Sequence, residues 1–184
     1  MPRAVFQVLS SSGFQVVQSV SPEVTAFFSN AMSGRRHGAS WVPPQVEIVT
    51  DDEDGRDLTP FDAALMGFAG LGFILTARAV ECIGGFLRDY GEILELSCEQ
   101  MELYAFNSTI ILPALDVDNS RVRRFSDGSI YAIRKPTFHA AEISDDIFRV
   151  SGMRISDVYF TDRAVSVWHA SNLKGLEFKE IWRR

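Results

Sequence analysis

Short strand-like runs separated by turn residues occupy most of this 184-residue chain, and they restrict its fold more than any other feature. Val-rich runs at 5–9 and 14–20 are separated by Ser and Gly, so they predict two strands or one hairpin. Further runs of strand character lie at 45–50, 93–96, 103–111, 129–135, 147–150, 155–160 and 176–182. Because few helical segments lie between them, the pattern predicts an α+β fold, a mainly antiparallel sheet with a few helices packed on it.

The clearest helical segment begins after Thr76, which is placed to cap a helix that runs through Tyr90. Its apolar stripe consists of Val80, Ile83, Leu87 and Tyr90. Gly91 follows the last turn, where a left-handed cap favours glycine. Gly84-Gly85 inside the helix costs about 1 kcal/mol per glycine relative to alanine, so we expect a neighbouring segment to pack closely there.

A second, shorter helix is predicted near the C-terminus. Thr161-Asp162 forms its cap, and the helix is expected to end at about Asn172. Between the strand-like runs, residues 115–128 form a turn-rich connection that contains a compact basic turn of Arg121, Arg123 and Arg124. No internal repeat, low-complexity tract or linker interrupts the chain, so residues 1–184 are expected to form a single domain.

The charge balance argues against some partners. The chain has 18 basic and 24 acidic residues, a net charge of −6, which on average repels nucleic acid and anionic membranes. The sequence contains no run of 18 consecutive apolar residues, so it predicts no membrane span. The first residues also lack the apolar core of a signal peptide. The sequence therefore predicts a cytoplasmic protein that binds neither nucleic acid nor membrane.

Side chains that could perform catalysis are scattered. His37, His139 and His169 stand in no metal-ligand or catalytic arrangement, and neither do Cys82 and Cys98. The glycine-bearing stretch 67–72 lacks the ending of a phosphate-binding loop, and it is interpreted as an apolar turn. We therefore expect no enzyme activity, no catalytic residue, no metal and no cofactor.

Two acidic stretches, at 47–62 and 89–102, are the strongest charge features. They serve either as a solvated face that keeps the protein soluble or as a surface that docks a basic partner. In the second interpretation the first contacts come from Asp51, Asp52, Glu53, Asp54 and Asp57. Trp41 is a further candidate partner contact, although a tryptophan beside Pro43-Pro44 also fits the edge of a core.

The order of several motifs resembles a family of bacterial polymorphic-toxin immunity proteins, the eleventh immunity family, part of which was catalogued as a domain of unknown function. The resemblance covers residues 41–182, and residues 1–40 carry little of it. The matching segments are Trp41-Val42-Pro43, FILTARAVECIGGFLRDYGEILEL at 73–96, Tyr104-Ala105-Phe106-Asn107, Leu115-Asp116, DGSIYAI at 127–133, IFRV at 147–150, VYFTDR at 158–163 and LKGLEFKEIW at 173–182.

The resemblance implies a protein without catalytic activity that binds and neutralises a cognate toxin, such as those delivered between competing bacteria by type VI secretion. The family's shared residues look structural, and toxin-contacting surfaces vary, so no contact residue transfers by resemblance. The alternative is a general interaction or adaptor module of the same fold, which would bind a partner without protecting cells from a toxin.

Overall fold

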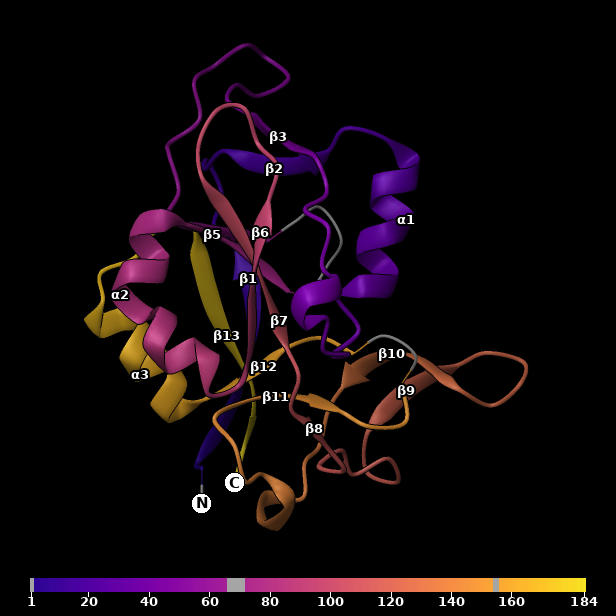
Figure 1. Cartoon of the computed structure of the whole chain (residues 1–184). Coiled ribbons are helices and arrows are strands. Elements are labelled where there is room, and N and C mark those ends of the chain that lie inside the picture. Colours follow the sequence, from indigo (N-terminus) through magenta and orange to yellow (C-terminus); the bar gives the residue numbers. More distant parts are fainter. Residues whose placement is uncertain (1, 66–71, 154–155) are drawn as a thin grey trace.

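The computed structural model describes residues 2–65, 72–153 and 156–184 (Figure 1). It confirms the predicted α+β fold, with mostly antiparallel sheets and three helices packed on them. The predicted turn at 67–72 lies outside the described residues except for Gly72. Within the described part, no helix is long and apolar enough to cross a membrane.

The largest sheet combines the two ends of the chain. In spatial order its strands are β13 (Leu176–Arg183), β1 (Ala4–Ser10), β12 (Tyr159–Thr161), β11 (Ile147–Val150) and β8 (Ile111–Leu112). All neighbours are antiparallel except β11 and β8. Of the expected strand at 155–160, residues 156–158 are outside a strand, while Tyr159 and Phe160 belong to β12.

A second sheet is formed by the middle of the chain. Its antiparallel strands are, in order, β4 (Ala63–Leu65), β5 (Phe73–Thr76), β7 (Leu103–Ser108) and β6 (Gly91–Leu96). Two separate ribbons complete the strands, β2 (Val16–Ser19) with β3 (Val46–Val49) and β9 (Arg121–Arg124) with β10 (Ile130–Lys135).

The structure decides between the two alternatives for the first strand-like runs. They are two strands and no hairpin, because β1 has β12 and β13 as neighbours on its two sides while β2 pairs with β3. The expected basic turn at 121–124 is wrong, since these residues pair with β10 as the strand β9. The neighbours of β1 come from the far end of the chain, and nothing in the local pattern specifies them.

The predicted helices are present. In α2 (Ala77–Arg88) the Thr76 hydroxyl accepts from the Ala79 amide at 3.3 Å, and in α3 (Asp162–Ala170) Thr161 caps in the same way. An additional helix, α1 (Pro22–Ala31), starts at Ser21, whose side chain caps it. Its N-terminal cap and Pro22 at the first turn were available as sequence signals.

The expected cap role of Gly91 is wrong. Gly91 lacks a positive φ and is the first residue of β6. A Cβ there would lie 2.2 Å from the Asn107 carbonyl oxygen on β7, so the close approach of two strands excludes a side chain. In α2 the expected close packing of a neighbouring segment holds for Gly84, where a Cβ would lie 3.4 Å from the Ile93 side chain of β6, but not for Gly85, which faces open space.

The main core cluster lies between the two large sheets. Ala63, Phe73 and Phe106 come from the four-stranded sheet, and Val8, Phe160 and Leu176 come from the five-stranded one. Leu87 of α2 and Trp168 of α3 add to it, and both helices lie on the same side of the molecule (Figure 1). A second cluster packs α1 and the β2–β3 ribbon against the four-stranded sheet. A third lies beneath the β9–β10 ribbon.

Candidate functional site

The acidic loop 51–57 follows β3 and projects at one end of the molecule (Figure 1). Its two ends meet at an antiparallel bridge between Asp51 and Asp57. Inside it, the Asp52 amide donates to the Arg56 carbonyl and the Gly55 amide donates to the Asp52 carbonyl, both at 2.9 Å. Gly55 has φ +73°, a conformation that favours glycine. The loop is therefore a closed turn.

The five predicted acidic residues differ in their contacts. Asp51 accepts from the Thr50 hydroxyl at 3.1 Å. Asp52 builds the turn, because its Oδ1 accepts from the Asp54 and Arg56 amides, each at 2.9 Å. Asp54 pairs with the exposed Arg56 guanidinium at 3.1 Å, a contact that solvent screens strongly. Within the part of the chain that the structure describes, Glu53 and Asp57 form neither a side-chain hydrogen bond nor an ion pair, and both are exposed.

Part of the second acidic stretch reaches the same end. The turn between β6 and β7 is joined to β3 through Gln100, whose side chain accepts from the Ile48 amide and donates to the Ile48 carbonyl, both at 2.8 Å. Glu99 on this turn and Glu47 on β3 line one shallow hollow. We call the loop 51–57 together with Glu47, Glu99 and Glu102 the acidic end. Glu92 lies elsewhere and accepts from two backbone amides of the loop after α1.

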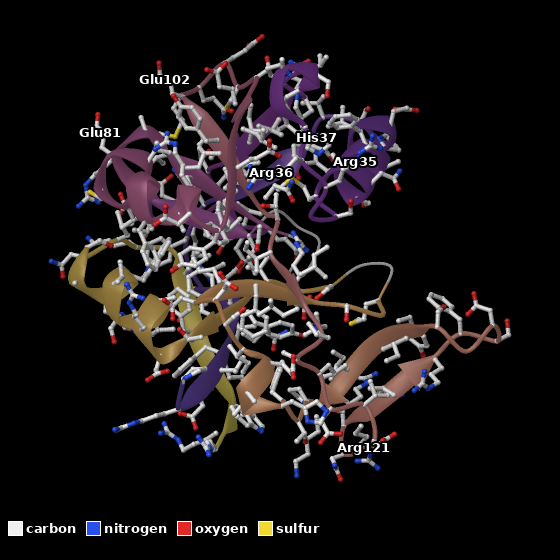
Figure 2. The ribbon with its side chains drawn as sticks, turned by 60° about the horizontal axis from the view of Figure 1, so that its bottom comes forward. Arg35, Arg36, His37, Glu81, Glu102 and Arg121 are labelled. Carbon is white, nitrogen blue, oxygen red and sulfur yellow. The ribbon has the colours of Figure 1, made fainter. Side chains whose placement is uncertain are left out.

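A larger hollow of about 430 Å³ adjoins Glu102, which is labelled in Figure 2. Phe61 and Met101 supply apolar surface there, and Asp62 pairs with Arg78 at 2.5 Å on the rim. The hydrogen bond to Asp62 raises the pKa of Arg78, so the guanidinium stays charged. The hollow combines apolar surface with a carboxylate rim, a shape that suits an aromatic or long basic side chain of a partner.

Sequence reasoning missed this hollow. Its lining residues are Phe61, Asp62, Thr76, Ala77, Arg78, Met101 and Glu102. They come from three distant segments, so no local motif indicates the hollow. The one available signal is the acidic stretch that contains Glu102.

Trp41 is fixed at the edge of the second core cluster. Its indole N–H donates to the Glu95 carbonyl at 2.7 Å, and its ring contacts Phe27 at 5.6 Å and His37 at 5.2 Å between centroids. It is half-buried, and among the described residues it makes no hydrogen bond or ring contact with the acidic loop. The structure thus separates this candidate from the acidic residues.

The histidines do not converge. His37 Nε2 bonds the Ala31 carbonyl at 2.8 Å, His139 lies 3.8 Å from Asp116, and His169 contacts the ring of Phe178. Among the residues that the structure describes, no group of three His, Cys, Asp or Glu side chains is arranged to hold a metal ion.

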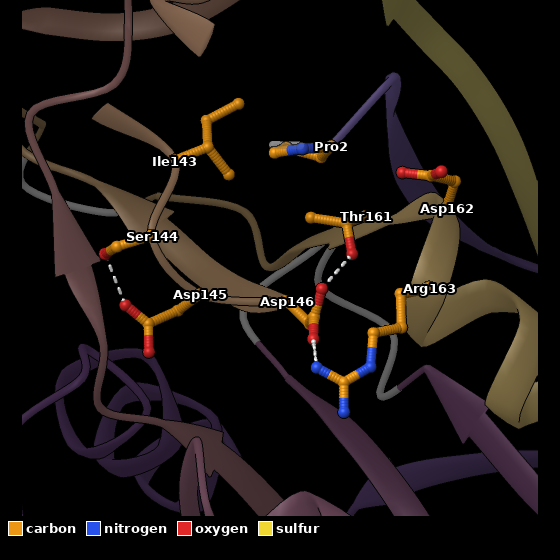
Figure 3. A pocket seen from close by; sticks show the side chains of 8 residues that line it. All are labelled: Pro2, Ile143, Ser144, Asp145, Asp146, Thr161, Asp162 and Arg163. Carbon is orange, nitrogen blue, oxygen red and sulfur yellow. Dashed lines mark hydrogen bonds and ion pairs between the residues drawn. The ribbon is translucent and has the colours of Figure 1, made fainter. Parts of the chain in front are cut away.

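A polar cavity of about 280 Å³ lies beside the start of α3 (Figure 3). Asp146 accepts from Thr161 Oγ1 at 2.5 Å, from Arg163 at 2.9 Å and from the Tyr90 hydroxyl at 3.2 Å. Burial, and after it the contact with the Asp146 carboxylate, raise the pKa of Tyr90, so that hydroxyl keeps its proton. These polar groups satisfy one another and join α2, α3 and β11, an arrangement that serves the fold.

No model of a known protein family matches this sequence, and a comparison with curated proteins finds no match either. The resemblance to an immunity family therefore stays a prediction, and no function is transferred from a relative.

Proposed function

We propose that this chain is an immunity protein that binds and neutralises a cognate secreted antibacterial toxin through a tight, non-catalytic protein complex. The observation that carries the proposal is the acidic end. Glu53 and Asp57 stand exposed on a closed turn, without internal counter-charges in the described part, at the end that also holds the acidic turn between β6 and β7. The resemblance of the motif order across residues 41–182 to an immunity family suggests that the partner is a toxin.

The acidic end would act by attraction and then by occlusion. Clustered carboxylates speed the encounter with a basic surface, and a basic cleft is typical of an enzyme with an anionic substrate. The hollow beside Glu102 would then receive an anchoring side chain. Neutralising a lethal enzyme requires nanomolar affinity, about −12 kcal/mol, and an interface of roughly 1,600 Å².

The first test is capture of the partner from the native host with a tagged chain, followed by a protection assay. A single stoichiometric partner that kills cells when expressed alone, and that is harmless when this chain is co-expressed, is the expected result. Binding without protection would contradict the immunity function and favour the adaptor alternative.

The second test measures association rates of that partner with the Glu53→Lys/Asp57→Lys variant. Asp52 is left intact because it holds the turn together. We expect association about tenfold slower at low salt, with a flatter salt dependence. Glu142→Lys/Glu177→Lys, the same charge change at two exposed residues elsewhere, is the control. Equal rates for all three proteins would exclude the acidic end as the contact surface.

A further inference from the structure

The β9–β10 ribbon forms an arm, residues 121–135, that extends away from the body of the molecule (Figure 1). Its inner side is anchored, because Val122 and Ile133 are cross-strand partners that pack on the third core cluster. Its base is held by the Thr137 amide, which donates to Ser120 Oγ at 2.8 Å. The arm is therefore a supported platform for the side chains on its outer side.

The arm carries concentrated positive charge. The arm contains five basic residues and a single acidic one, a net charge of +4, whereas the remaining residues sum to −10 from 13 basic and 23 acidic side chains. The basic residues are Arg121, Arg123, Arg124, Arg134 and Lys135, all exposed. In the described part of the molecule, none of them forms an ion pair.

Two of these cations oppose each other directly. Arg121 is the cross-strand partner of Lys135, an arrangement of like charges that destabilises a ribbon. Arg123 lies two residues from Arg121 on the same side of β9, about 7 Å along the strand. Such a row is unfavourable in the isolated protein and favourable once an anionic chain lies across it.

Aromatic rings accompany the cations toward the tip. Phe125 and Tyr131 lie with ring centroids 4.9 Å apart, and they are 48% and 45% exposed. Exposed rings beside arginines are the combination that binds unpaired bases by stacking and phosphates by forked hydrogen bonds. Unpaired bases use the rings while their phosphates use the arginines, whereas a duplex hides its bases from the rings.

We propose that the arm binds a short stretch of single-stranded nucleic acid. The net charge of −6 argues against binding over the whole surface, but the arm is separated from the acidic end at the opposite side of the molecule (Figure 1). This inference is independent of the proposed function, since it involves neither the acidic loop nor a toxin.

The test is fluorescence anisotropy of a labelled oligothymidylate of about 12 nucleotides with the full chain, between about 50 and 200 mM salt. Saturable binding is expected, with a slope of log affinity against log salt of about −3, because each phosphate contact of a single strand contributes about −0.7. Arg121→Gln/Arg123→Gln should weaken binding at least tenfold and reduce the slope by about 1.4. Phe125→Ala/Tyr131→Ala should weaken binding severalfold with an unchanged slope.

The matched control is Arg35→Gln/Arg36→Gln, which removes the same charge from an exposed loop elsewhere (Figure 2). Its affinity should stay within twofold of the parent, and circular dichroism should show every variant folded. The proposal is overturned if no saturable binding occurs, if the control loses as much affinity as the arm variant, or if a glutamate-rich peptide binds more tightly than the oligonucleotide. That last outcome would assign the arm to an acidic protein partner.

Discussion

Single glycines show how closely the strands of the four-stranded sheet approach. Gly91 meets the Asn107 carbonyl across β6 and β7, and Gly175, with φ +107°, lies against the Ala63 carbonyl. Both positions leave no room for a Cβ. Their glycines are required by tertiary contacts and not by the end of a helix.

We expect Gly91→Ala to lower the free energy of unfolding by about 2–3 kcal/mol, because the added methyl forces β6 away from β7. Gly85→Ala is the control, since nothing lies within 4 Å of its new Cβ and alanine is the better helix former. This control should be neutral or stabilising by up to about 1 kcal/mol. Urea denaturation measures the free energy of unfolding of both variants. Equal values for Gly91→Ala and Gly85→Ala would contradict the close approach of β6 and β7 as the reason for a glycine at position 91.

At the scale of elements, the turn before β9 depends on an ionised side chain. Asp116 accepts from the side chain of Asn119 at 2.8 Å and from its amide at 3.1 Å. These hydrogen bonds favour the carboxylate and lower the pKa of Asp116. When the pKa of a carboxyl group is lower in the folded than in the unfolded state, ionisation stabilises the fold. This stabilisation is fully present at a pH above the unfolded-state pKa, and it is lost as the pH falls through the folded-state pKa.

Asp116→Asn should therefore be less stable than the parent at pH 6, and the difference should shrink below about pH 4. Denaturant titrations at several pH values measure this. Asp118→Asn, an exposed neighbour in the same turn, should show no such trend. A difference for Asp116→Asn that persists unchanged in acid would show that the charge is irrelevant.

At the scale of the whole molecule, the two large sheets share their main core, because Phe73 of one contacts Phe160 of the other at 5.9 Å between ring centroids. Trp168 of α3 also packs edge-on against Phe73. Neither sheet retains a complete apolar core without the other. We therefore expect residues 1–184 to unfold in one cooperative step.

The measurement is denaturation followed both by tryptophan fluorescence, which reports on Trp41, Trp168 and Trp182 in the three core clusters, and by far-ultraviolet circular dichroism. Coincident curves are expected. Separate midpoints for the two signals would show that the sheets unfold as independent units.

Local chemistry alone determined much of this protein. Hydroxyl caps at Thr76 and Thr161, the helices they begin and most strand-like runs follow from side chains within a few residues of one another. The acidic run at 51–57 likewise indicates an exposed loop, because so many like charges cannot be buried together.

Tertiary structure decided which segments meet. Nothing near β1 in the sequence specifies β12 and β13 as its neighbours. The β9–β10 ribbon differs, because a short turn that contains Asp127-Gly128 joins its strands. The hollow beside Glu102, the fixed position of Trp41 and the close approach at Gly91 also depend on residues distant in sequence. The physical reason is the distance along the chain over which each interaction acts. Helix caps and hydrophobic periodicity act within one turn or one strand, whereas strand pairing and burial depend on the free energy of the whole assembled core.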